Sequence, residues 1–300
     1  MKMTVASAPV SWGIMESVPF PTEYPYCRVL DEIAQAGYAG TELGPYGFLP
    51  TDPTELCQQL DKRKLTLCSA FVEVCLADKG AIKAQLKQME RTAKLLREAG
   101  CHLLILSDEK TAERCALAGR CAGTQQYSYN QQQWRVAKQT ICKVLDCCAK
   151  LGMRVAFHHH VGTHVETPEE IDRLFSLFSP EELGLCLDTG HCIYGGGDPQ
   201  KVLEQHIGRL RCLHFKDVDG AKLQDVRRER HDFHEAVRQC VFAPLGRGVV
   251  DFPRLLNLVR KHNFEDWIVV EQDVLEGGSN GASPLANAVA ARKFLQQMGV

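Results

Sequence analysis

Short apolar runs alternate along the chain with longer segments in which apolar residues recur every three or four positions. The short runs are apolar throughout rather than alternating, which is typical of strands buried on both faces of a parallel sheet. We expect strands at 4–8, 40–43, 66–71, 103–107, 154–159, 183–187, 210–215 and 267–271.

Amphipathic helices are predicted between these strands, at 25–36 and 81–99 among others. In each, the apolar residues fall on one face of a helix with a period of 3.6 residues, and Gly37 ends the first helix. The stripes consist of Val29, Leu30, Ile33 and Ala34 in the first and of Ile82, Leu86, Met89, Ala93 and Leu96 in the second.

Four helix starts share one local pattern, a capping residue followed by proline. The capping side chain accepts a bond from an unsatisfied backbone N–H, and proline suits the first helical position. Two of the caps also have a glutamate three residues on, which is the spacing of a capping box. The pairs are Asp52–Pro53, Thr167–Pro168, Asp198–Pro199 and Ser283–Pro284, and the glutamates are Glu55 and Glu170.

Eight strands, each followed by a helix, predict a closed (β/α)8 (TIM) barrel made by residues 1–300 as a single domain. The alternative is a doubly wound open sheet, which usually carries a glycine-rich phosphate turn after its first strand; residues 9–13 lack that pattern. Two long intervals between strands place insertions at about 108–130 and 217–247. Both follow a strand, so we expect them on the C-terminal face, where barrel active sites lie, as candidate lids.

Composition excludes several classes of protein. Hydrophobic residues make up 45% and charged residues 24% of the chain, which is ordinary for a globular protein. No run approaches the roughly 18 apolar residues of a membrane helix, and the first 13 residues lack the apolar segment of a signal peptide. The formal net charge of −2 disfavours a nucleic-acid partner.

The chain has 14 cysteines, none of them in C-x-x-C spacing. Many lie inside apolar runs, as Cys186 and Cys212 do, and we interpret them as small buried residues in a reducing compartment. We therefore expect a cytoplasmic protein.

Residues able to bind a metal gather at the ends of the predicted strands. The parity of a strand puts His158 and His160 on one face and His159 on the other. In a closed barrel these ends surround one mouth, and a set of imidazoles and carboxylates suits Mn, Co, Fe or Zn, so we expect one divalent ion there. The strand-end residues are Glu42, His158, His159, His160, Asp188, His214, Lys216, Glu271 and Asp273, with His191 shortly after Asp188.

Seven segments together resemble the xylose isomerase-like barrel superfamily, over essentially the whole chain. The run LDTGH and the glycine-rich PLGRGVVDF are shared across that superfamily, whereas FHHHVGTHVET with LHFKDV is more specific for its inosose dehydratase branch. The segments are APVSWG (8–13), AGYAGTELGPYGFLP (36–50), FHHHVGTHVET (157–167), LDTGH (187–191), LHFKDV (213–218), PLGRGVVDF (244–252) and VVEQD (269–273).

The resemblance implies a metal held by side chains from strands five to eight. Carried over by position, the ligands are His158, Asp188, His214 and Glu271, where His158 replaces the glutamate that is usual in the superfamily. Two carboxylates and two imidazoles would neutralise a divalent ion, which favours Mn or Co, with Zn or Fe also possible, over Mg. Glu166 is the alternative to His158, from the adjoining loop.

The resemblance also implies removal of water from 2-keto-myo-inositol (scyllo-inosose), in inositol catabolism, through an enediolate stabilised at the metal. The product would be a trihydroxycyclohexane-dione. Lys216 and His160 are then the candidates for base and acid, and a lowered pKa would let Lys216 act as the base. Substrate contacts are expected from His191, Glu42, Trp12 and Arg247.

Three alternatives remain open at this level. The first is isomerisation or epimerisation of a keto sugar, against which His158 in place of glutamate argues. The second is dehydration or elimination of another keto-polyol, such as dehydroshikimate or a 3-keto-glycoside. The third is a sugar-binding or DNA-processing barrel, which the net charge disfavours. We expect a small-molecule keto-polyol partner, no nucleic acid or membrane, and possibly a homodimer.

Overall fold

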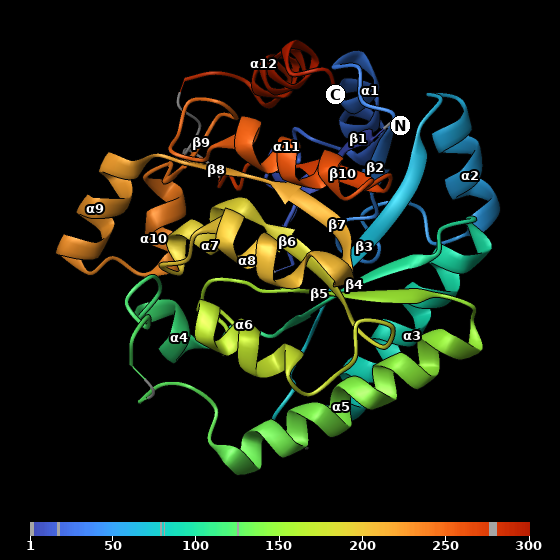
Figure 1. Ribbon diagram of the computed structural model, residues 1–300. Helices are drawn as coiled ribbons and strands as arrows, with labels where there is room; N and C mark the ends of the chain where they lie inside the picture. The colour runs from blue at the N-terminus through green and yellow to red at the C-terminus, as the bar shows by residue number, and fades with distance from the viewer. Residues whose placement is uncertain (1–2, 17–18, 79, 81, 125, 276–280) are drawn as a thin grey trace.

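Eight parallel strands close into a barrel surrounded by helices in the computed structural model, which describes residues 3–16, 19–78, 80, 82–124, 126–275 and 281–300 (Figure 1). The order around the barrel is β1-β10-β7-β6-β5-β4-β3-β2, and every neighbouring pair is parallel. The strands are β1 (Thr4–Ser7), β2 (Gly40–Glu42), β3 (Thr66–Val74), β4 (Leu103–Asp108), β5 (Arg154–His158), β6 (Gly184–Asp188), β7 (Leu210–Phe215) and β10 (Trp267–Val270).

Helices connect successive strands and pack on the outside of the barrel. Those between barrel strands are α1 (Tyr26–Gln35), α2 (Pro53–Asp61), α3 (Ile82–Glu98), α5 (Gln131–Lys150), α6 (Pro168–Phe175), α7 (Thr189–Tyr194), α8 (Pro199–His206) and α11 (Phe252–Lys261), and α12 (Pro284–Gln297) follows the last. Short 3-10 helices are η1 (Pro9–Trp12) and η2 (Ile207–Arg209).

The closed barrel confirms the predicted fold and excludes the open sheet. All eight strands begin within one residue of their expected positions, and β3 continues three residues further than the sequence pattern indicated. Helices α1 and α3 match the predicted stripes, although residue 81, the expected start of the second, lies outside the described residues. No helix in the described part of the chain combines the length and apolar character needed to cross a membrane.

The four predicted caps are all present. Asp52, Thr167, Asp198 and Ser283 each accept a bond from a backbone N–H in the first turn of the helix they precede. The reciprocal bond that completes a capping box occurs at Thr167 with Glu170. These local signals fix where each helix starts, and therefore the length of the loop that separates it from the preceding strand.

Alternate residues of each strand face opposite sides of the barrel wall. Ala156, Cys186, Cys212 and Val269 belong to an apolar cluster inside the barrel. Their neighbours belong to the larger core between the barrel and the helices: Val155, Phe157, Leu185, Leu187, Leu213, Phe215, Ile268 and Val270. Two residues beyond each of the four inward positions, the chain reaches the C-terminal mouth, so the next side chain of the same parity must point into that mouth.

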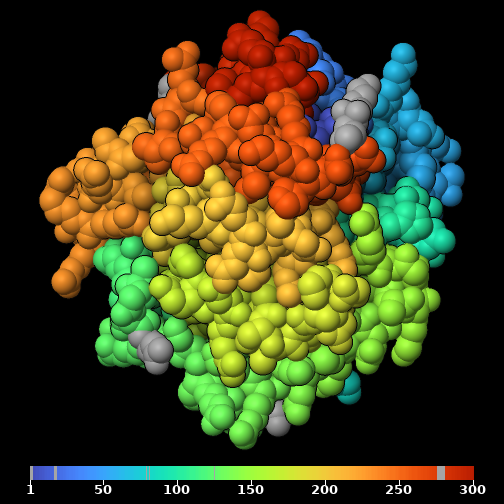
Figure 2. Space-filling view, in the orientation of Figure 1, coloured from blue at the N-terminus to red at the C-terminus, as the bar shows by residue number. Residues whose placement is uncertain are grey.

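Both predicted insertions lie at this mouth and pack against each other. The first contains α4 (Ala112–Ala116), and the second contains β8 (Asp217–Val218), α9 (Gly220–Glu229), α10 (Phe233–Arg238) and β9 (Phe242–Ala243). Figure 2 shows the green segment of the first insertion beside the orange second one. A separate apolar cluster joins them, and its members include Cys115, Ala118, Phe233 and Val237.

A buried ion pair fastens the first insertion to α6. The guanidinium of Arg114, which is fully buried, donates to both carboxylate oxygens of Glu170, at 3.0 and 2.9 Å. Ser128, near the end of the insertion, donates to the same carboxylate at 2.6 Å. Because Glu170 also accepts from the backbone N–H groups of Glu166 and Thr167, one side chain holds the insertion, the loop after β5 and the start of α6 together.

We expect Arg114→Ala to lower the free energy of unfolding by about 3–5 kcal/mol, because it leaves the Glu170 carboxylate buried without its cation. Urea unfolding followed by circular dichroism measures the loss. Arg97→Ala, on the exposed face of α3, is the control and should change stability by less than about 0.5 kcal/mol. Equal effects of the two substitutions would contradict a structural role for this ion pair.

Candidate metal and catalytic site

The four predicted metal ligands come together at the C-terminal mouth. They come from four neighbouring strands: His158 and Asp188 end β5 and β6, His214 lies near the end of β7, and Glu271 follows β10. Each offers one ligand atom, these atoms all lie within 4.8 Å of one another, and all four side chains are buried. The inward parity of the strands, with Ala156, Cys186, Cys212 and Val269 two positions earlier, is what brings them into one group.

The polar atoms of this group fit a divalent ion. Nε2 of His158 lies 3.5 Å from Oδ2 of Asp188, and Nδ1 of His214 lies 3.3 Å from Oε2 of Glu271. Within the described residues, Nδ1 of His158, Oδ2 of Asp188 and both ring nitrogens of His214 are buried without a hydrogen-bond partner. Buried polar atoms are normally hydrogen-bonded. One ligand atom from each of the four residues can therefore serve a divalent ion, for which imidazoles and carboxylates are suitable ligands.

Glu42, which we expected to contact substrate, lies next to Nε2 of the metal-ligand candidate His214. Its Oε1 accepts a bond from the Ser69 hydroxyl at 2.7 Å and lies 3.2 Å from Nε2 of His214. Burial opposes protonation of His214, but the adjacent Cys186, followed by Glu271 and Glu42, raises its pKa well above the usual value. A carboxylate behind the second nitrogen is the arrangement that orients metal-bound histidines, so Glu42 fits that role while it also lines the pocket.

Glu166, the alternative to His158, forms hydrogen bonds outside the group of metal-ligand candidates. Its two carboxylate oxygens accept from the backbone N–H groups of Gly119 and Gly162, each at 2.8 Å, and Arg114 lies 3.7 Å away. It therefore braces the first insertion, and the geometry favours His158 as the fourth ligand.

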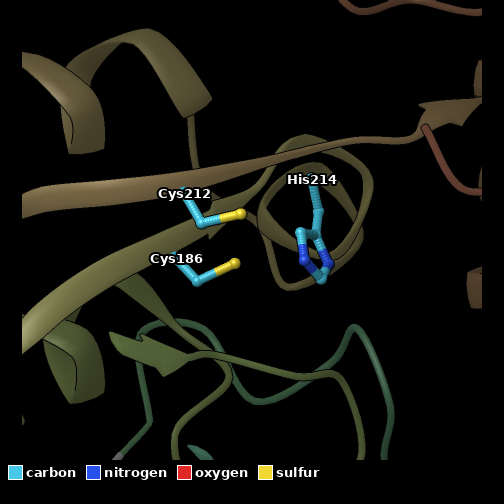
Figure 3. A group of neighbouring side chains, drawn as sticks. All are labelled: Cys186, Cys212 and His214. Atoms are coloured by element: carbon cyan, nitrogen blue, oxygen red, sulfur yellow. The ribbon is translucent and has the colours of Figure 1, made fainter. Parts of the chain in front are cut away.

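Two cysteines lie directly below the group. Cys186 and Cys212 are register partners on β6 and β7, and Figure 3 shows their sulfur atoms pointing toward the ring of His214. Burial raises the pKa of Cys186 well above its usual value, so its thiol stays neutral and is a poor ligand in this setting. Most of the cysteines are buried, in keeping with the interpretation that they are small packing residues.

Lys216 stands beside the metal group and faces three carboxylates. Its Nζ lies 2.7 Å from Asp273, 3.1 Å from Glu271 and 3.3 Å from Asp188. Burial alone would lower the pKa of Lys216, but these carboxylates outweigh it and the net pKa is raised. These contacts favour the ammonium form of Lys216. The lowered pKa expected from the sequence depends on a neighbouring metal cation and stays a prediction.

His160 has the opposite electrostatic character. Burial, followed by the positive charge of Lys110, lowers its pKa well below the usual value, so the ring is neutral. Its Nδ1 lies 2.6 Å from the carbonyl oxygen of Val161, which can only accept, so Nδ1 carries the proton and Nε2 keeps its lone pair. The ring packs on His191 with 3.8 Å between centroids, and Nε2 of His191 lies 3.0 Å from Nζ of Lys216.

A pocket lies above these residues. Its walls include residues that the sequence analysis did not select, from the strand ends and from both insertions. They are Glu16, Phe71, Lys110, Phe233 and His234. The strand-end rule that selected the ligands would also have found Lys110, two residues beyond β4, whereas nothing local marked Phe233 or His234.

Two of the expected substrate contacts lie elsewhere, which corrects those predictions. Trp12 is buried against α1 and donates its indole N–H to Glu32 at 2.7 Å, because the 3-10 turn of η1 points Pro9 and Val10 into the pocket instead. Arg247 is exposed and outside the pocket lining.

The loop that carries Arg247 is held by Asp217. Its carboxylate accepts from the backbone N–H groups of Gly246, Gly248 and Val250 at 2.8–3.1 Å, which draws the backbone inward and leaves the Arg247 side chain in solvent. A Cβ at Gly248 would lie 2.3 Å from Oδ1 of Asp217, so this close approach requires glycine.

Comparisons with known proteins agree with this geometry. The family model described as "Xylose isomerase-like TIM barrel" matches residues 30–298. The chain is similar to an inosose dehydratase of Geobacillus kaustophilus, 30% identical over 98% of this chain and 94% of the relative, and to the rhizopine catabolism protein MocC of Rhizobium meliloti, 32% identical over 99% and 89%. Among solved structures, the IOLI protein with a bound zinc atom superposes with a TM-score of 0.72 at 14% identity, covering 99% of this chain and 98% of that one.

We expect alanine substitution of Asp188, His214 or Glu271 to remove most of the bound metal, because each takes away one of the four grouped ligands. Elemental analysis of the purified proteins measures it, and EDTA should lower the melting temperature of the unmodified protein, since a bound ion stabilises only the folded state.

The matched comparison is His158→Ala with Glu166→Gln. His158→Ala should lose metal, whereas Glu166→Gln should keep its metal content and lose stability instead. The reverse result would return the fourth ligand to Glu166.

Proposed function

The chain belongs to the xylose isomerase-like TIM barrel family, and we propose that within it the protein is a metal-dependent hydro-lyase that removes water from 2-keto-myo-inositol (scyllo-inosose). Relatives named inosose dehydratase match nearly the whole chain at 26–30% identity, which supports the substrate. The observation that carries the chemistry is the pairing of a neutral His160 and a cationic Lys216 beside a buried group of metal ligands.

His158, Asp188, His214 and Glu271 would hold the ion. Their two imidazoles favour Mn or Co, with Zn or Fe as further possibilities, over the all-oxygen site that Mg prefers. A divalent ion bound there supplies a Lewis acid for the ketone oxygen.

His160 is the proposed base. Its Nε2 has a free lone pair because Nδ1 faces the Val161 carbonyl, and the ring lines the pocket two positions from the ligand His158. A carbon next to the ketone, placed over this ring, can give its proton to Nε2. Phe71 and Phe233 border the same ring and limit access of water to it.

Lys216 is the proposed electrostatic partner of the ketone oxygen. Its ammonium is fixed by Asp273 at 2.7 Å and reaches the oxygens of Asp188 and Glu271, so it stands where negative charge develops when the α-proton leaves. His191, whose Nε2 faces this ammonium, and Glu42 border the pocket and are suited to hold hydroxyl groups of the ring. Loss of the β-hydroxyl would then give a trihydroxycyclohexane-dione and water.

The setting that we propose is inositol catabolism in the cytoplasm. The thirteen cysteines other than Cys240 are free thiols, which supports a reducing compartment. The keto-polyol is the proposed small-molecule partner, and a homodimer stays a prediction.

We expect the protein, loaded with Mn or Co, to convert scyllo-inosose to a product lighter by one water, with a new absorbance from the enone or dione. Mass spectrometry and ultraviolet absorbance follow the reaction. A keto-sugar epimerase would give a product of unchanged mass, and that outcome from inosose would overturn the assignment.

His160→Gln should abolish exchange of the α-hydrogen of inosose with solvent deuterium while metal content stays near normal, because only the lone pair that accepts the proton is lost. General bases typically contribute about 10²–10⁴-fold to the rate. Lys216→Arg should retain more activity than Lys216→Met, because this role needs a positive charge rather than a lone pair. Wild-type exchange in His160→Gln would exclude it as the base.

A further inference from the structure

A second lysine lines the pocket, on the side contributed by the first insertion. Lys110 lies two residues beyond β4, and its ammonium forms an ion pair with Glu73 on β3. Both side chains are only 15% exposed. Among the described residues that border the pocket, Lys110 and Lys216 are the lysines, and no arginine is among them.

The two lysines have different neighbours. Lys216 contacts the carboxylates of Asp188 and Glu271, which places it at the metal group and beside the ketone oxygen. Lys110 contacts Glu73, which is not one of the four grouped ligands, and borders the pocket together with Glu16 and His234. Lys216 therefore forms ion pairs with two of the grouped ligands, whereas the ion pair of Lys110 is with a residue outside that group.

Dehydration needs a second catalytic group, at the position where Lys110 borders the pocket. When the α-proton leaves, its electron pair is first held by the ketone as an enolate. In a second step the C=O bond re-forms, the electron pair makes the Cα=Cβ double bond, and the bond from Cβ to its hydroxyl breaks. Hydroxide is a poor leaving group, so the departing oxygen requires a proton from an acid. Cβ is one carbon further from the ketone than Cα, so the acid must lie further from the metal than the base does.

We propose that Lys110 is the general acid that protonates the departing β-hydroxyl. This inference rests on the dehydration proposed above and deepens it. The ammonium gives its proton to the hydroxyl oxygen, water leaves with the electron pair of the broken bond, and Lys110 becomes a neutral amine. The proton taken up by His160 leaves to solvent and Lys110 regains one from solvent, so the balance is the loss of one water with no oxidant or reductant.

The surroundings of Lys110 suit a proton donor. Burial, the largest influence, lowers its pKa from the usual value, and the charge of Lys216 acts in the same direction, although Glu16 opposes both. Glu73 keeps the ammonium at the pocket wall, so that the side chain does not extend into solvent. A lysine whose proton is more easily released is a better acid near neutral pH.

The test separates proton abstraction from elimination in the metal-loaded enzyme with scyllo-inosose in deuterium oxide. Lys110→Met should lower the rate of water loss by about 10²–10⁴-fold. It should still exchange the α-hydrogen for deuterium, because the proposed base His160 is retained and loss of the Lys110 charge makes its ring more basic. The ratio of exchange to turnover should therefore rise. Lys143→Met, on the exposed face of α5, is the matched control and should leave both rates unchanged.

A second substrate keeps the test decisive if the substitution disturbs the pocket. The analogue with fluorine in place of the departing hydroxyl needs little protonation, so Lys110→Met should release fluoride at close to the wild-type rate. Lys110→Arg, which keeps the charge but holds its proton, should resemble Lys110→Met with both substrates.

Water loss by Lys110→Met within about threefold of wild type would overturn the proposal, and so would a parallel loss of exchange, turnover and fluoride release. If unmodified protein exchanges the α-hydrogen but never loses water, the proposed function fails instead, independently of Lys110.

Discussion

Asp188, Glu271 and Asp273 bury three carboxylates together at the mouth of the barrel, and compensation of their charge governs the arrangement around them. Lys216 approaches all three but lies nearest to Asp273. A divalent ion with Asp188, Glu271 and two neutral imidazoles has no net charge, and Lys216 with Asp273 has none either. A fourth buried carboxylate, Glu42, lies 3.2 Å from Nε2 of His214, so the mouth holds more negative charge than Lys216 alone offsets, and a divalent ion would compensate the remainder.

The barrel brings these carboxylates together because alternate residues of each strand point to the same side of the barrel wall. Asp188 is two residues past Cys186, which is packed inside the barrel, and the same relation holds on the other three ligand strands. A shift of one residue in any of them would exchange a ligand for a residue facing the helices. Stability and chemistry therefore depend on the same register, and the buried ion pair of Arg114 and Glu170 adds the insertion that carries Lys110.

Features set by neighbouring residues along the chain could be predicted from the sequence, whereas features set by distant contacts could not. The strands followed from apolar runs, and the caps followed from local chemistry at each helix start. Parity placed metal-binding side chains at the strand ends, and the resemblance to the barrel superfamily selected four of them as ligands. Trp12 and Arg247 were placed wrongly because a 3-10 turn and the bonds of Asp217 to a distant loop decide where they point. Phe233 and His234 reach the pocket only through packing of one insertion on another, which no local pattern records. The raised pKa of Lys216 depends on three carboxylates from two other strand ends, so its role as a cation became evident only in three dimensions.

The central claim is that the buried carboxylates and imidazoles hold a single divalent ion while Lys216 stays with Asp273. Anomalous diffraction from crystals grown with Mn or Co tests it most directly. We predict one anomalous peak, from an ion bound by His158, Asp188, His214 and Glu271. The Lys216 ammonium should then lie within hydrogen-bond distance of Asp273. The claim would be contradicted by a peak at the Cys186 and Cys212 sulfurs or by a peak at Glu166. It would also be contradicted if the mouth showed no peak and Lys216 stayed between Asp188 and Glu271.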